Sequence, residues 1–295
     1  MIYDVIIIGM GPAGVSAAIY LKMAGLNILT IDGGPFGGTL NYIDKIDNYP
    51  GLYNITGPDL ALQMFNHIKK LDINFINEKV LNIVLDKKIK VVETKNNKYK
   101  CNNVIIAAGR IPKKLGLKDE EFLLGKGIST CALCDGSFYK GKKVAVVGGG
   151  ASALGEALYL ANICEKVYLI HHSKAFSIKS EIVEEVLNKN NVECLMNSKI
   201  TELINCDGKL SGIVVNEHVI EVEGLFTYIG FEPKVPFAKS LGILDENGYV
   251  NVNGSYQTVI DGVYAIGDVI KKDLYQIVTA VSDGANVASK IIEKS

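Results

Sequence analysis

Arginine is almost absent from this sequence, and the charges that are present nearly cancel. Of the 31 basic residues only Arg110 is an arginine, and 32 acidic residues bring the net charge to -1. Proteins that bind nucleic acids attract the phosphate backbone with a basic face, which this composition does not provide. We therefore expect no nucleic-acid partner.

A long apolar run is also missing. The apolar start of the chain, residues 1–9, is too short to cross a membrane and lacks the basic flank and cleavage site of a signal peptide. We expect no membrane association and a cytoplasmic location. Because 48% of the 295 residues are hydrophobic, the chain can still build one large or two ordinary globular domains.

Cysteine is too sparse for a disulfide-stabilised scaffold. Six cysteines occur in 295 residues, and only Cys131 and Cys134 are close in sequence. A zinc site needs a second pair of ligands, so we expect no metal centre. The remaining cysteines stand singly, at Cys101, Cys164, Cys194 and Cys206.

The pair formed by Cys131 and Cys134 suggests redox chemistry. Two cysteines separated by two residues can close a small disulfide and reopen it when electrons arrive. Two idle buried thiols are the alternative interpretation. The pair follows one glycine-rich turn and directly precedes another, and this setting favours a redox-active disulfide.

The first glycine-rich turn carries a full dinucleotide-binding pattern. Residues 4–8 contain four consecutive β-branched residues, which is typical of a buried strand, and the glycines of Gly9–Gly14 follow. A helical stretch over 15–24 and a strand over 27–31 come next, and the strand ends in Asp32. The glycines allow close approach of a pyrophosphate at the helix N-terminus, and Asp32 can accept hydrogen bonds from ribose hydroxyls. A glycine-rich turn without a ligand is the alternative.

A second turn of the same kind lies further along the chain. Residues 143–147 predict a buried strand, 148–153 a glycine-rich turn, 154–163 a helix and 166–170 another strand. The chain therefore repeats one βαβ nucleotide-binding architecture, which predicts an α/β fold. The stretch 113–127, rich in lysine and glycine, is expected to be a linker between domains.

The C-terminal region returns to the pattern of the first fold. Residues 262–269 predict a strand that ends in Gly267 and Asp268, and a helix is expected over 275–292. A buried aspartate in this position commonly accepts a hydrogen bond from the ribityl chain of a flavin. A helix N-cap is the alternative role.

Together these segments resemble the low-molecular-weight thioredoxin reductases over essentially the whole chain. The position of the cysteine pair is the most specific part of the match. Flavin–nicotinamide relatives of the same shape lack a disulfide there, and larger disulfide reductases carry theirs in the first domain. Besides the first dinucleotide pattern, the resemblance rests on Gly37–Leu40, Asp47–Gly51, Cys131–Gly136, Gly148–Ala153, Gly267–Asp268 and Gln276.

The resemblance implies two Rossmann-like domains of the FAD/NAD(P)-binding, three-layer ββα type, with the second inserted in the first. Residues 1–112 and 244–295 would form the FAD domain, and 113–243 the inserted redox-disulfide domain. FAD is the implied cofactor, thioredoxin the implied substrate, and a homodimer the implied assembly. Flexible links are expected near 111–117 and 241–245.

The resemblance also implies roles for individual residues. Reduced flavin would pass two electrons to the disulfide, with Cys134 nearest the flavin and Asp135 exchanging protons with the thiolates. The implied catalytic residues are therefore Cys131, Cys134 and Asp135. The residues implied to hold FAD are Gly9, Gly11, Pro12, Ala13, Gly14, Asp32, Gly33, Gly37, Gly38, Thr39, Leu40, Asn48, Val80, Ala107, Ala108, Gly109, Gly267, Asp268, Gln276, Ile277 and Val278.

The segment after the second strand of the inserted domain departs from the NADPH-dependent members. They carry His-Arg-Arg-x-x-x-Arg, whose guanidinium groups bind the 2′-phosphate by charge-assisted contacts. Here the three arginine positions hold His172, Ser173 and Ser177. Ala151 stands where aspartate or asparagine is usual, and Tyr275 where the family has arginine. Since each charge-assisted bond contributes about 1.5–3 kcal/mol, their loss should cost several kcal/mol of phosphate binding.

This pattern is similar to the flavin thioredoxin reductases that take electrons from ferredoxin, so reduced ferredoxin is the donor we expect. One alternative is an NADPH-dependent thioredoxin reductase with a degenerate phosphate site, near Lys174 and Lys179. A second is an NADH-linked flavin disulfide reductase that serves a peroxidase. A third is a non-catalytic redox sensor that signals through the state of its disulfide.

Overall fold

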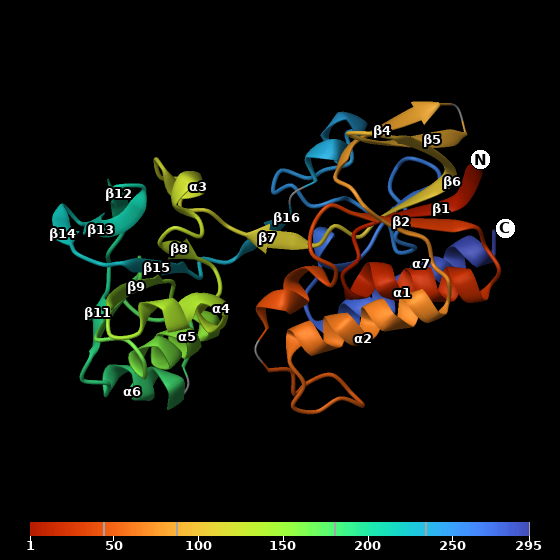
Figure 1. The fold of residues 1–295 in the computed structure, drawn as a ribbon. Helices are drawn as coiled ribbons and strands as arrows, with labels where there is room; N and C mark the ends of the chain where they lie inside the picture. The colour runs from red at the N-terminus through yellow and green to blue at the C-terminus, as the bar shows by residue number, and fades with distance from the viewer. Residues whose placement is uncertain (44, 87, 180, 234, 295) are drawn as a thin grey trace. The chain divides into compact units, whose positions relative to one another are not determined.

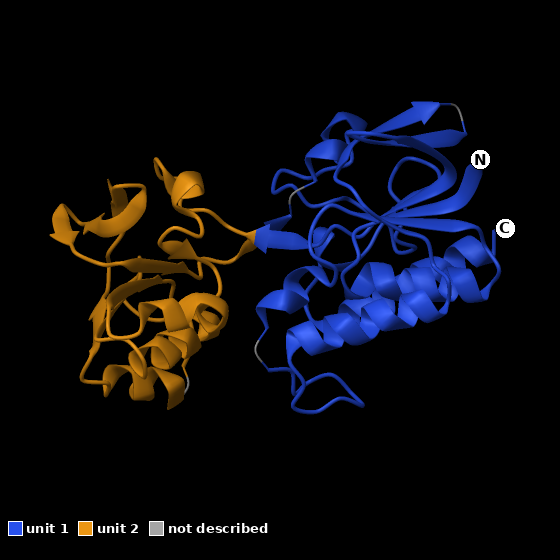
Figure 2. Cartoon of the chain, viewed as in Figure 1, with its two compact units in different colours: residues 1–111, 232–295 blue, residues 112–231 orange. Residues whose placement is uncertain are grey.

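The chain forms two compact units. The structure is a computed structural model that describes residues 1–43, 45–86, 88–179, 181–233 and 235–294. Residues 1–111 and 232–295 form unit 1, and residues 112–231 form unit 2 (Figure 2). Unit 1 is therefore made from two stretches that are separated in sequence by unit 2.

A mostly parallel sheet forms the centre of unit 1 (Figure 1). Its strands lie in the order β3-β2-β1-β6-β5-β4, and β17 also pairs with β6. Strand β5 runs antiparallel to both of its neighbours, β6 and β4, and the other pairs of neighbouring strands are parallel. The strands span Ile2–Ile8 (β1), Ile28–Asp32 (β2), Phe75–Asn77 (β3), Val80–Asp86 (β4), Ile89–Thr94 (β5), Lys98–Ile106 (β6) and Val263–Ala265 (β17).

Alternating residues of β1 divide the interior of unit 1 into two cores. Val5 and Ile7 face helices α1 (Pro12–Met23), α2 (Gly57–Lys70) and α7 (Ile277–Ile292), which cover one face of the sheet (Figure 1). Ile6 and Ile8 face a second core on the opposite side. All four side chains are buried, as the β-branched run of this strand predicts for a strand covered on both faces.

Helices α1 and α7 approach each other closely at one glycine. A Cβ added to Gly284 of α7 would lie 2.3 Å from the carbonyl oxygen of Ala13 in α1. The missing side chain therefore lets the C-terminal helix rest directly on the helix of the first glycine-rich turn.

The second boundary of unit 1 differs in position from the predicted domain boundary. The chain returns to unit 1 at residue 232, whereas the sequence placed the return at 244. The physical reason is that Val235, Phe237 and Ile243 are buried in the second core of unit 1. The assignment of the units as an FAD domain and an inserted redox domain stays a prediction.

Unit 2 has its own parallel sheet in the order β11-β10-β9-β15-β8. Helices α5 (Ala151–Ala161) and α6 (Glu181–Leu187) pack on one face, and the antiparallel sheet β12-β13-β14 packs over the other. Both units therefore have the α/β nucleotide-binding architecture, which confirms the predicted fold class. The strands span Ile128–Ser129 (β8), Lys143–Val147 (β9), Lys166–Ile170 (β10), Val192–Leu195 (β11), Ile200–Cys206 (β12), Lys209–Val215 (β13), His218–Ile220 (β14) and Gly224–Thr227 (β15).

The stretch 113–127 is an ordered part of unit 2, and its interpretation as a linker was wrong. It contains helix α3 (Glu120–Leu123), and Leu123 is buried in the core. The Glu120 carboxylate is 7% exposed and accepts the backbone N–H groups of Leu115 and Gly116 at 2.8 Å each. This carboxylate replaces the hydrogen bonds that a sheet or helix would give the segment.

Among the described residues, no helix is both long enough and apolar enough to cross a membrane.

The remaining elements are short. The short strands are β7 (Arg110–Pro112) and β16 (Phe231–Pro233), and the short helical elements are α4 (Ala132–Asp135), η1 (Gly38–Tyr42), η2 (Gly136–Tyr139), η3 (Pro236–Leu241) and η4 (Gly267–Val269).

Candidate active site

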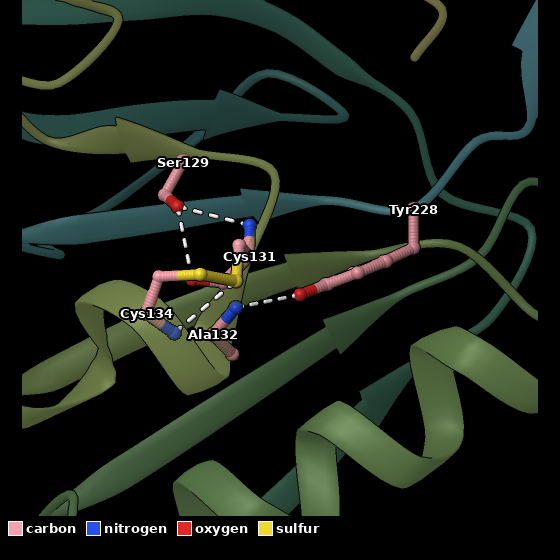
Figure 3. Close-up of a disulfide and its surroundings, with 5 residues drawn as sticks. All are labelled: Ser129, Cys131, Ala132, Cys134 and Tyr228. Atoms are coloured by element: carbon pink, nitrogen blue, oxygen red, sulfur yellow. Dashed lines mark hydrogen bonds between the residues drawn. A yellow bond between two sulfur atoms is a disulfide. The ribbon is translucent and has the colours of Figure 1, made fainter. Parts of the chain in front are cut away.

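Cys131 and Cys134 are joined in a disulfide at the carboxyl end of strand β8 (Figure 3). Cys131 is buried and forms the N-cap of helix α4, and its sulfur accepts the backbone N–H of Cys134 at 3.1 Å. Cys134 is exposed. Because thiol–disulfide exchange needs access to a sulfur and a thiolate that is stabilised locally, this arrangement suits a disulfide that opens and closes.

Ser129 fixes the backbone directly before the disulfide. Its hydroxyl accepts the N–H of Cys131 at 3.0 Å and donates to the carbonyl oxygen of Cys131 at 3.2 Å (Figure 3). The side chain thus holds the turn between β8 and α4. Sequence reasoning missed this serine, although a serine two residues before a cysteine at a strand end is a recognisable turn signal.

Tyr228 holds the other side of the disulfide segment. Its hydroxyl accepts the N–H of Ala132, the first residue of α4, at 2.7 Å (Figure 3). Burial raises the pKa of Tyr228, and the Glu156 carboxylate, to which the hydroxyl donates a hydrogen bond, raises it further. The phenol therefore stays protonated at neutral pH and links α4 to helix α5. Nothing in the sequence indicates this contact, because Ala132 and Tyr228 are 96 residues apart.

Replacing Tyr228 with phenylalanine should destabilise unit 2. The N–H of Ala132 would keep its buried position but lose its acceptor, which costs about 1–3 kcal/mol. Chemical denaturation of the oxidised protein measures this loss. Tyr139→Phe is the matched control, since within the described parts of the chain its hydroxyl has no hydrogen-bond partner. Equal stabilities of the two variants would contradict the assignment of Tyr228.

Asp135, the predicted proton-exchange residue, ends helix α4 and is half-buried. Its backbone N–H donates to the carbonyl oxygen of Cys131 at 3.2 Å. The carboxylate therefore belongs to the same turn, residues 131–135, as both sulfurs, as the sequence spacing requires.

The second glycine-rich turn is partly covered by the chain itself. The His171 ring lies against Gly149, where an added Cβ would be 2.2–2.5 Å from its atoms, and the N–H of Ser177 donates to the carbonyl oxygen of Gly149 at 2.8 Å. Burial lowers the pKa of His171, and the neighbouring His172 lowers it further. The ring is therefore neutral at pH 7 and offers no charge to a phosphate.

The predicted FAD-binding turn of unit 1 has no room for a side chain at Gly9 or at Gly14. A Cβ on Gly9 would lie 2.3 Å from the carbonyl oxygen of Ala107, and one on Gly14 would lie 2.0 Å from that of Gly9. Pro12 occupies the first turn of α1, where its fixed φ and missing N–H suit a helix start. The turn lies beside β1, where the strand order reverses, which is the usual ligand position in such sheets.

Asp32 has a structural role, and its contact with a ribose stays a prediction. One carboxylate oxygen accepts the N–H of Met10 at 2.6 Å, and the other accepts the N–H of Gly34 at 2.9 Å. The side chain thus connects the first glycine-rich turn, residues 9–14, to the glycine loop that follows β2. Each carboxylate oxygen has a second lone pair, so contact with a ribose hydroxyl remains compatible with these bonds.

The glycine loop closes over the first turn. The N–H of Gly37 donates to the carbonyl oxygen of Met10 at 2.9 Å, and Gly37 and Gly38 both have positive φ. Asn41, which sequence reasoning missed, donates to the carbonyl oxygens of Phe36 and Gly38 and fixes the loop. Thr39 and the buried Leu40 follow in η1.

Other predicted residues lie around the same end of the sheet. The N–H of Ala107 donates to the carbonyl oxygen of Ile8 at 2.7 Å, which places Ala108 and Gly109 directly beyond β6. A Cβ on Gly33 would meet the Cα of Lys79 at 2.7 Å, next to the buried Val80.

The C-terminal segment reaches this site at two points. A Cβ on Gly267 would lie 2.8 Å from the Cβ of Ala13, so Asp268 stands beside the first turn. Gln276 caps helix α7, and its side-chain oxygen accepts the amide of Asn48 at 2.9 Å. Ile277 and Val278 begin that helix. The structure therefore gathers the predicted FAD residues at one end of unit 1, and the glycine-lined cradle fits a dinucleotide.

Comparisons with known proteins agree with this arrangement. The family model described as pyridine nucleotide-disulphide oxidoreductase matches residues 3–284. The chain is 38% identical to a thioredoxin reductase of Bacillus subtilis, over 98% of this chain and 94% of that one.

The solved structures that the chain resembles are also thioredoxin reductases. The thioredoxin reductase of Lactococcus lactis in its FR conformation has a TM-score of 0.90 and 33% identity, over 99% of this chain and 100% of that one. A ferredoxin-flavin thioredoxin reductase of Clostridium acetobutylicum has a TM-score of 0.55 and 32% identity, over 99% and 97% of the two chains.

Proposed function

The chain belongs to the pyridine nucleotide-disulphide oxidoreductase family and, within it, to the thioredoxin reductases, and from this premise we propose that its Cys131–Cys134 disulfide reduces thioredoxin. It is an FAD flavoprotein, as the sequence predicts. The observation that carries the proposal is the disulfide itself, which joins a buried and an exposed cysteine on one turn at a strand end.

The proposed reaction opens and recloses this disulfide. When bound and reduced by its electron donor, FAD would supply the two electrons that cleave the sulfur–sulfur bond, and two protons would complete the dithiol. One thiolate then attacks the disulfide of thioredoxin and forms a mixed disulfide. The second thiolate displaces it, which restores Cys131–Cys134 and releases reduced thioredoxin.

Two groups on α4 act on the sulfurs of the opened disulfide, one by hydrogen bonding and one by proton exchange. The N–H of Cys134 points at the Cys131 sulfur, and a hydrogen bond to a thiolate lowers the cost of deprotonation. Asp135, on the same turn, is the residue we assign to proton exchange with the leaving thiolate. The predicted approach of Cys134 to the flavin is part of the same proposal.

The electron donor is the part of the proposal on which two observations disagree. The description of the matching family names a pyridine nucleotide. The thioredoxin reductase of Lactococcus lactis also has a higher TM-score than the ferredoxin-flavin thioredoxin reductase of Clostridium acetobutylicum. Both findings favour a nicotinamide donor. The segment 172–177 favours ferredoxin, because it offers no guanidinium and the adjacent His171 is neutral. On that local chemistry we keep reduced ferredoxin as the proposed donor.

Anaerobic titration of the oxidised protein tests the donor. Reduced ferredoxin should bleach the flavin, whereas micromolar NADPH or NADH should leave it oxidised, because segment 172–177 provides neither arginines for a phosphorylated ribose nor an acid for an unmodified one. Rapid bleaching by micromolar NADPH would overturn the ferredoxin proposal and assign the exposed Lys174 or Lys179 to the phosphate. The proposal that the disulfide reduces thioredoxin does not depend on which of these donors reduces the flavin.

The organisation of the protein completes the proposal. Unit 1 would be the FAD domain, unit 2 the redox-disulfide domain, and two chains would form a homodimer in the cytoplasm. Sedimentation of the flavin-loaded protein measures the assembly, and a monomer at micromolar concentration would contradict it.

A further inference from the structure

Arg110 stands apart from every other basic residue of the chain. Lysine serves at all the remaining basic positions, so the protein meets almost every need for positive charge without a guanidinium. A guanidinium differs from an ammonium in being planar, permanently charged and able to stack on an aromatic ring while it pairs with a carboxylate. A position that keeps arginine in this chain is therefore one where those properties are used.

The surroundings of Arg110 use both properties at once. Its Nη2 lies 3.1 Å from Oδ2 of Asp268, and the side chains of the pair are only 18% and 25% exposed. Its guanidinium carbon lies 3.8 Å from the centre of the Tyr275 ring. A lysine in this place can pair with the carboxylate but has no flat face to lay on the ring.

Asp268 is held from two sides. Its second oxygen, Oδ1, lies 3.7 Å from Nζ of Lys272, which also pairs with Asp283 at 2.9 Å. Asp283 in turn accepts the N–H of Gly267 at 3.0 Å. The orientation of the Asp268 carboxylate, beside the first glycine-rich turn, is therefore fixed by two cations, Arg110 and Lys272.

Tyr275 connects Arg110 to the start of helix α7, which carries predicted FAD-binding residues. It directly precedes Gln276, the N-cap of α7, which is hydrogen-bonded to Asn48. The thioredoxin reductases that this chain resembles have arginine at position 275. Here the ring at 275 carries the guanidinium of Arg110 on its face, so the positive charge is supplied to the same place from strand β7 instead.

We propose that Arg110 is a positioning residue of the FAD site, fixing Asp268 and the start of α7 and placing beside the cofactor the charge that the family carries at position 275. The inference depends on FAD binding and not on the electron donor. Two expectations follow. Without Arg110 the anionic cofactor is held less tightly, and the reduction potential of the flavin falls, because a nearby positive charge favours the more negative, reduced form.

Four variants test the assignment. Arg110→Ala should weaken FAD binding about 10- to 100-fold, because it removes one charge-assisted hydrogen bond and one cation–π interaction. Arg110→Lys should restore most of the potential but only part of the affinity. The double variant Arg110→Ala with Tyr275→Arg should recover both, because it returns the guanidinium to the family position. Lys271→Ala, an exposed neighbour of equal charge, should change neither.

The measurements separate a role at the cofactor from a role in folding. They are FAD release from the holoprotein followed by flavin fluorescence, the midpoint potential of the flavin, and the melting temperature with saturating FAD. Unchanged affinity and potential in Arg110→Ala would overturn the proposal, as would a lower melting temperature at saturating FAD with no change in potential. Failure of the wild-type protein to reduce thioredoxin would instead overturn the proposed function and leave this inference standing.

Discussion

Cys131→Ser is expected to abolish thioredoxin reduction, with a loss of about 10³-fold or more, while reduction of the flavin by its donor continues. The reason is that both electrons must pass through the Cys131–Cys134 bond, and a serine oxygen neither forms that bond nor acts as the thiolate. Reduction of thioredoxin coupled to a chromogenic disulfide measures the loss. Anaerobic bleaching of the flavin measures the step that should survive.

The control for this prediction is Cys206→Ser, since Cys206 is exposed and single at the end of β12. It should turn over like the wild-type protein. A Cys131→Ser variant of normal activity would assign thioredoxin reduction to a different cysteine pair.

The protonation of the other buried cysteines argues against a second redox-active cysteine pair. Burial raises the pKa of the Cys101 thiol to about 12 and that of the Cys164 thiol to about 11, and it also raises the pKa of Cys194. At neutral pH these side chains hold almost no thiolate, which is the reactive form. They therefore serve as small apolar side chains in the two units and cannot take over the reaction of Cys131.

Gly14→Ala is expected to remove FAD from the protein. The added Cβ would lie 2.0 Å from the carbonyl oxygen of Gly9, and Gly9 cannot retreat because its own α-carbon faces the carbonyl of Ala107. Relieving the clash must open the turn between β1 and α1, which costs about 4 kcal/mol or more and spoils the diphosphate cradle. The visible flavin absorbance of the purified variant, relative to its protein absorbance, should fall close to zero.

Gly150→Ala is the matched control, because it changes a glycine of the second turn where an added Cβ meets no atom within 4 Å and φ is negative. Its flavin content should equal that of the wild-type protein. Far-UV circular dichroism shows whether Gly14→Ala also unfolds the chain. A yellow Gly14→Ala protein would show that this turn does not hold the cofactor.

The fold and the two glycine-rich turns could be predicted because their signals are local. The run of Val5 to Ile8 indicates a strand that is buried on both faces, and the glycine spacing after it indicates where the backbone must turn. By contrast, Val235 and Phe237 carry no sign of which unit they join, since an apolar residue fits either core. The unit boundary was therefore placed too late in the sequence.

The supporting residues of the site could not be predicted in the same way. The scarcity of arginine is visible in the sequence, but the partner of Arg110 lies 158 residues away. Tyr228 and Ala132 meet only because β15 lies beside β8 in the sheet of unit 2. Asp32 was predicted for a ribose, and its hydrogen bonds to Met10 and Gly34 became evident only from the loop geometry.

The split of unit 1 into residues 1–111 and 232–295 has a consequence for synthesis on the ribosome. Unit 2 is one uninterrupted stretch, so it can fold as soon as it leaves the exit tunnel. The first stretch of unit 1 emerges earlier but must wait for β17 and for α7, whose Gly284 rests on Ala13. The nascent chain therefore carries an unfinished, apolar first half until its last helix is made, and chaperones should be needed most during that interval.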